Sequence, residues 1–93
     1  MKSKVYMINH QRGWTALLTE CNTFSIVEVL ENTMPELGDI ISGEIESLGG
    51  ETLYNETKKE TLEVFIQDIY ADRSEALRQL NIHNGNKTQW EIL

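Results

Sequence analysis

The chain has 93 residues, of which 40% are hydrophobic and 25% charged, a composition that predicts one small globular domain. Its formal net charge of −7 has the wrong sign for a protein that neutralises many phosphates, although the few residues before Glu20 are mildly basic. No apolar run is long enough to cross a bilayer, no signal-peptide pattern opens the chain, and Cys21 has no second cysteine to pair with. We therefore expect a cytoplasmic protein that makes no membrane contact.

The first part of the chain predicts an antiparallel meander of three strands. Residues 5–8 and 14–20 are apolar, β-prone runs, and the polar segment between them ends in Arg12-Gly13. Residues 24–30 are dominated by β-branched and aromatic side chains and follow a polar turn. Short polar turns between such runs are typical of neighbouring antiparallel strands.

Two more strands are expected after the only proline, Pro35, where the chain leaves the meander. Residues 39–45 form the fourth, with Gly43 marking a bulge or a thinner core. Residues 61–70 form the fifth. The insertion between them, residues 48–59, is open: part of it can form one arm of an extra hairpin that turns at Lys58-Lys59.

A short helix is expected over residues 73–81, because Asp72 followed by Glu75 is a helix start signal. Its apolar side chains share one face, which we expect to cover an open end of a barrel. Residues 82–93 lack the periodicity of a packed element and are expected to form a polar, mobile tail.

Evenly spaced short strands followed by one helix predict an all-β fold. We expect a small five-stranded antiparallel barrel of the oligonucleotide-binding (OB) type over residues 1–70, with one C-terminal helix within residues 71–81.

The segment from Lys4 to Leu17, Lys-Val-Tyr-Met-Ile-Asn-His-Gln-Arg-Gly-Trp-Thr-Ala-Leu, resembles the opening of the cold-shock domain family. In that family a Lys-Val pair, aromatic residues, an Asn, a polar loop and a basic-Gly-aromatic motif follow one another. The segment Leu-Gly-Asp-Ile-Ile-Ser-Gly-Glu-Ile, residues 37–45, also resembles the family's Gly-led fourth strand.

The resemblance implies that the chain binds single-stranded RNA or DNA on the outer face of its first three strands, where the family stacks bases on aromatic side chains. On this sequence the matching site consists of Lys4, Met7, Arg12, Trp14 and Ile26. Most family aromatics are replaced, by Met7, Ile26 and Val29 among others, and Glu28 puts a negative charge on the same face. Because each base–aromatic stack is worth roughly 1–3 kcal/mol, we expect weak binding.

A second hypothesis keeps the barrel but changes the ligand to a protein. In that case the same strands present an apolar patch to a partner, made by Trp14, Ala16, Leu18, Ile26 and Val29. Trp14 itself has two interpretations, a base-stacking platform or a half-buried strand residue.

No arrangement of residues predicts catalysis. His10, Cys21 and His83 are not linked by any spacing known for a metal site or a nucleophile–base pair, and there is no glycine-rich phosphate loop. We therefore expect no enzyme activity, no metal and no cofactor.

Overall fold

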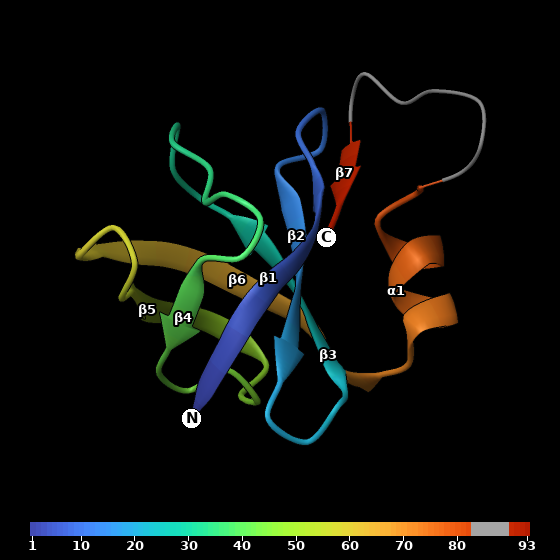
Figure 1. The fold of residues 1–93 in the computed structure, drawn as a ribbon, viewed down its shortest axis with the longest axis horizontal. Coiled ribbons are helices and arrows are strands. Elements are labelled where there is room, and N and C mark those ends of the chain that lie inside the picture. Colours follow the sequence, from blue (N-terminus) through green and yellow to red (C-terminus); the bar gives the residue numbers. More distant parts are fainter. Residues whose placement is uncertain (83–89) are drawn as a thin grey trace.

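The computed structural model describes residues 1–82 and 90–93, whose strands curl into a barrel with the helix on its outside (Figure 1). The described elements are β1 (Lys2–Asn9), β2 (Trp14–Thr19), β3 (Phe24–Val29), β4 (Ile40–Ser42), β5 (Gly49–Asn55), β6 (Glu60–Ala71), α1 (Arg73–Gln79) and β7 (Trp90–Ile92).

Six strands close the barrel in the order β1-β2-β3-β6-β5-β4, and β4 returns to β1. Every neighbouring pair in this ring is antiparallel. The structure is therefore a closed antiparallel barrel with one short helix, consistent with the predicted small OB-type barrel and C-terminal helix. The predicted meander of the first three strands is confirmed.

The barrel has one strand more than predicted, because part of the insertion forms β5. This strand pairs with β6 along its whole length, so the hairpin that the sequence left open is present. The fourth strand is shorter than predicted and ends at Ser42. Gly43 follows with φ +132°, a backbone conformation that a side chain would strain.

The barrel interior is filled by aliphatic side chains from all six strands and the loop after β4. On β6 the predicted alternation is confirmed, since Leu62, Val64 and Ile66 are buried while Glu63 and Phe65 are exposed. The complete interior cluster is Val5, Ile8, Leu17, Val27, Val29, Ile41, Ile45, Leu53, Leu62, Val64 and Ile66.

A second apolar cluster lies outside the barrel, between the helix and the outer face of β1, β2 and β3. It contains Met7, Ala16, Phe24, Ile26, Ala71, Ala76 and Leu80. The predicted start of α1 is confirmed, because the Asp72 side chain accepts a hydrogen bond from the Glu75 amide at 2.8 Å. The expectation that the helix covers an open end of the barrel is wrong: it covers the side of the sheet.

The expectation of a mobile tail over residues 82–93 is wrong at its end. Trp90–Ile92 forms β7, which pairs with the Met7–Asn9 part of β1, beyond the part of that strand that pairs with β4 (Figure 1). Ile92 also packs against the outer cluster. The remaining prediction for this segment falls on residues 83–89, which lie outside the described residues.

Candidate interaction surface

Two of the predicted nucleic-acid contacts, Met7 and Ile26, have no exposed surface. Both point away from the barrel interior, as the strand register predicts: Ala16 is paired with Met7 on one side and with Ile26 on the other. The face they share is occupied by α1, whose Ala76 and Leu80 complete the cluster. The expected ligand platform is therefore part of the protein's own core in this structure.

An irregularity in β1 helps to build this second core. Val5 pairs with Leu17 and Met7 with Ala16, so Tyr6 is an extra residue in the strand. Tyr6 and Met7 consequently both face the outer cluster, and the Tyr6 ring meets Phe24 edge-on at 5.4 Å between centroids.

Polar contacts tie the β1–β2 loop to the end of the helix. The Asn9 amide group donates to the Leu80 carbonyl oxygen at 2.6 Å, and the Arg12 guanidinium donates to the Gln79 carbonyl oxygen at 2.6 Å. These two donors satisfy carbonyl groups that a helix end leaves without partners. Arg12 is therefore held by the helix.

Trp14 is half-buried, with the Arg12 guanidinium 4.1 Å from its ring centroid. One face of the indole ring is thus already covered by a cation. On the neighbouring strand Trp14 is paired with Glu28, whose carboxylate accepts a hydrogen bond from Gln67 at 3.1 Å. The surroundings of Trp14 contain one cation and one anion and leave it little free area for a nucleic-acid base.

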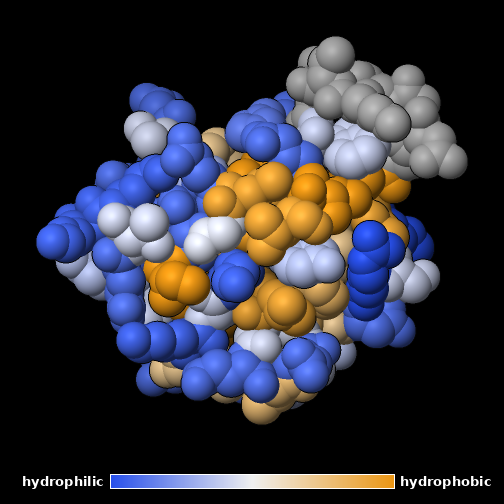
Figure 2. Space-filling model, in the orientation of Figure 1, coloured by the Kyte–Doolittle hydropathy of each residue, from blue (hydrophilic) through white to orange (hydrophobic). Residues whose placement is uncertain are grey.

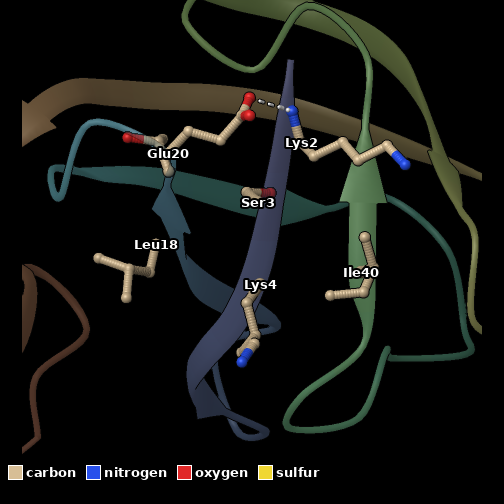
Figure 3. Close-up of a pocket in the computed structure, with 7 residues that line it drawn as sticks. Lys2, Ser3, Lys4, Leu18, Glu20 and Ile40 are labelled. Carbon is tan, nitrogen blue, oxygen red and sulfur yellow. Dashed lines mark hydrogen bonds between the residues drawn. The ribbon is translucent and has the colours of Figure 1, made fainter.

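Lys4 is the one predicted site residue that lines an open hollow. It is exposed, and it is paired with Leu18 of β2 on one side and Ile40 of β4 on the other. Figure 3 shows Lys4 on its strand, with Leu18 on one side and Ile40 on the other. They belong to a groove of about 300 Å³, here called the Lys4 groove, which is lined by Lys2, Ser3, Lys4, Leu18, Thr19, Glu20 and Ile40.

The charged groups at the Lys2 end of this groove already have partners. The Lys2 amide donates to Glu20 at 3.0 Å, and the Lys2 ammonium lies 3.1 Å from Glu56, which lowers the pKa of that carboxyl group. Among the described residues, none of the ion pairs includes Lys4. The groove therefore combines aliphatic walls with a cation that has no carboxylate beside it.

Hydrophobic side chains gather over the middle of the molecular face that displays β1, with hydrophilic side chains around them (Figure 2). The Lys4 groove lies on β1 between β2 and β4. Apolar surface rimmed by polar residues is typical of a site that meets another molecule.

A second hollow, of about 460 Å³, lies over β5 and β6 and has a different character. It is lined by Leu30, Gly50, Glu51, Thr52, Glu63 and Val64. Its Glu63 carboxylate accepts a hydrogen bond from the Thr52 hydroxyl at 2.6 Å. Because its charged lining is purely acidic, this hollow offers no site for a phosphate or a carboxylate.

Groups suited to catalysis are not brought together in the described part of the chain. His10 lies 2.5 Å from Glu91 and so links the β1–β2 loop to β7, while Cys21 is exposed. His83 lies outside the described residues. Within residues 1–82 and 90–93, no group of three or more His, Cys, Asp or Glu side chains is placed to hold a metal ion, and no helix is long and apolar enough to span a membrane.

The most strongly hydrogen-bonded buried charge, Asp39, is structural. Its carboxylate accepts from the Asn55 side chain at 2.8 Å and from the Glu36 amide at 3.0 Å, and it lies 3.3 Å from the Lys58 ammonium. Burial raises the pKa of Asp39, but the hydrogen bonds and the lysine together outweigh burial and leave the pKa lowered. The cluster fastens the loop before β4 to the β5–β6 turn.

Sequence reasoning missed Ile40, which forms one wall of the Lys4 groove. Alternation along β1 and β2 predicts that Lys4 and Leu18 face outward, but Ile40 joins them only because β4 closes the barrel against β1. No local pattern in the sequence predicts the pairing of β4 with β1.

Comparison with known proteins adds no relative: no family model, no curated protein and no solved structure matches the chain. The likeness to the cold-shock domain family therefore rests on the quoted residues alone.

Proposed function

We propose that this chain is a protein-interaction module that receives apolar side chains of a partner in the Lys4 groove. The observation that carries the proposal is a contrast on one side of the barrel. Met7 and Ile26 are fully buried beneath the helix, whereas Leu18 and Ile40 remain half-exposed around an open hollow. On this side of the barrel the groove thus offers apolar surface to a ligand, and its walls are aliphatic side chains rather than aromatic rings.

The patch expected for a protein partner has to be redrawn. Ala16 and Ile26 are fully buried and Val29 is 8% exposed, so only Leu18 and the half-buried Trp14 remain from the predicted set. Leu18 lines the groove, where Ile40 replaces the lost members. The proposal involves binding only, without catalysis or a cofactor.

The size of the groove sets the strength of the interaction. A volume of about 300 Å³ is at the lower end for small-ligand sites. A segment covering only this groove buries far less than the roughly 1,200–2,000 Å² of a stable complex. We therefore expect a weak, transient contact with one short segment of the partner.

Single-stranded nucleic acid has less support as a ligand. Of the five residues expected to bind it, two are buried, and Arg12 and Trp14 are engaged with the helix end and with each other. Stacking on the predicted platform requires α1 to leave, which exposes an apolar cluster to water. The net charge of −7 also opposes the binding of nucleic acid, because nucleic acid is itself negatively charged.

Selection of peptides from a random displayed library against the folded protein tests the proposal. We expect the selected peptides to shift the backbone amide signals of β1, β2 and β4, and to lose at least tenfold in affinity on Ile40→Glu. Phe65→Glu is the matched control, because Phe65 is 43% exposed on β6, a strand that does not line the groove. Peptides that bind both variants equally would contradict the proposal.

The competing ligand, single-stranded nucleic acid, is tested by the same amide-shift measurement. Mixed-sequence single-stranded RNA and DNA are titrated at low salt, where phosphate contacts are strongest. We expect no saturable shifts at Lys4, Arg12 and Trp14. Saturable oligonucleotide binding at these residues, weakened steeply by salt, would replace the proposal with nucleic-acid binding.

A further inference from the structure

We infer that the partner segment carries a carboxylate next to its apolar side chains, and that this carboxylate pairs with the Lys4 ammonium group. The inference rests on the proposed function, because it specifies the ligand of the same groove. It starts from the position of Lys4 on β1, between Leu18 and Ile40, which line the same groove.

The other cations of the described residues differ from Lys4. Lys2, Lys58 and Arg78 each lie beside a carboxylate, and Arg12 is bound to the helix end. Lys59 and Arg73 are also in no ion pair among the described residues, but they lie in a turn and at the start of α1, and neither belongs to the lining of the Lys4 groove. Lys4 thus combines a positive charge that has no ion pair among the described residues with a place in the groove lining.

A partner that covers the groove changes the solvation free energy of the Lys4 ammonium group. In the free protein water solvates the ammonium group, because Lys4 is exposed on β1 between Leu18 and Ile40. A partner that covers the groove removes that water. An ammonium group enclosed without a counter-charge costs several kcal/mol, which exceeds what one or two apolar contacts return.

The chain does not supply the missing counter-charge itself. Glu20 is the only carboxylate in the groove lining, and its Oε1 atom accepts a hydrogen bond from the Lys2 amide at 3.0 Å (Figure 3). No ion pair joins Glu20 to Lys4 within the described residues. Because no carboxylate of the described residues lies within ion-pair distance of Lys4, we assign the counter-charge to the partner.

The overall charge limits how acidic the partner can be. At physiological salt, charges further apart than about 8 Å are largely screened, so one carboxylate that touches Lys4 keeps its attraction. A tract of several carboxylates also meets the carboxylates of a chain whose net charge is −7. The groove is therefore suited to an apolar segment with a single Asp or Glu, not to a polyacidic tail.

A double-mutant cycle tests the inference with a groove-binding peptide from the selection described above. The acidic residue of the peptide is changed to its amide, Lys4 is changed to Met, and affinities are measured for all four combinations by calorimetry. Met keeps the aliphatic stem and removes the charge. Truncating one member of an enclosed ion pair typically costs about 2 kcal/mol or more, so we expect each single change to weaken binding by roughly thirtyfold or more. Both changes together should cost little more than one of them.

The outcomes separate the inference from the proposed function. Groove-binding peptides that contain no acidic residue, or whose affinity is unaffected by Lys4→Met, overturn the inference and leave the proposed function intact. Peptides that ignore Ile40→Glu overturn the proposed function itself. Lys59→Met is the control for loss of a positive charge far from the groove lining, and an equal loss of affinity with this variant contradicts a specific ion pair.

Discussion

The packing of α1 on the outer face of the sheet gives the sharpest stability prediction, tested by Leu80→Ala. Leu80 has no exposed surface and shares the outer cluster with Met7 and Ile26. Its carbonyl group, which accepts from Asn9 at 2.6 Å, is unchanged by the substitution. The loss therefore reports on side-chain packing alone.

The expected magnitude follows from the position of the cavity. Buried Leu→Ala changes cost about 2–5 kcal/mol, depending on how far the surroundings collapse. The outer cluster is a single layer between one short helix and the sheet, so we expect partial collapse and a cost of ~2–3 kcal/mol. For a domain of this size that lowers the thermal midpoint by roughly 10–20 °C.

Urea unfolding followed by circular dichroism measures this cost, with Leu77→Ala as the control on the same helix. Leu77 is only partly buried, so we expect less than half the loss. If Leu80→Ala costs under about 1 kcal/mol, or no more than the control, the helix does not hold the outer cluster. In that case Met7 and Ile26 would be open to a nucleic-acid ligand.

Three further predictions concern parts of the fold away from α1. Asp39→Asn should cost ~1–3 kcal/mol at neutral pH. The folded-state pKa of Asp39 is lowered, so the stabilisation by this carboxylate is present above the unfolded-state pKa and is lost as pH falls through the folded-state pKa. The variant should therefore show a smaller loss of stability at acid pH in pH-dependent urea unfolding. Gly43→Ala should cost ~1–3 kcal/mol in the same assay, because its φ is +132° and the new Cβ would lie 3.0 Å from Leu53, whereas Gly50→Ala, in open space, should be nearly neutral. Deleting residues 90–93 should lower the thermal midpoint in calorimetry by about 4–8 °C per kcal/mol lost with the β1–β7 pairing, and an unchanged midpoint would show that β7 adds no stability.

The interior of the barrel could be predicted from the sequence because local signals specify it. Alternation along residues 61–70 fixed the inward side chains, and the Asp72 cap fixed the start of the helix. The closure of the barrel by β4 against β1 could not be predicted, because it joins segments far apart in the chain. Docking of β7 on β1 depends on the same kind of long-range pairing.

A signal for the covered platform was nevertheless present in β2 and β3. Ala16, Leu17 and Leu18 in β2, and Ile26 and Val27 in β3, are apolar at consecutive positions rather than at alternate ones. A strand with one solvated face alternates, whereas a strand buried on both faces shows a near-continuous apolar run. Ala16 and Ile26 belong to these runs, so the apolar pattern alone predicts that both residues are buried.

The apolar outer face of the first three strands also explains why the proposed ligand surface lies elsewhere on the barrel. Met7, Ala16 and Ile26 give the outer sheet face an apolar area, and exposing that area to water is unfavourable. Helix α1 removes it from water by supplying Ala76 and Leu80. The cover does not reach the first residues of β1, where an exposed lysine lies between two aliphatic side chains. A surface built in this way suits a ligand that brings its own apolar side chain and its own negative charge, which is why the partner's carboxylate is the decisive variable in the binding experiment.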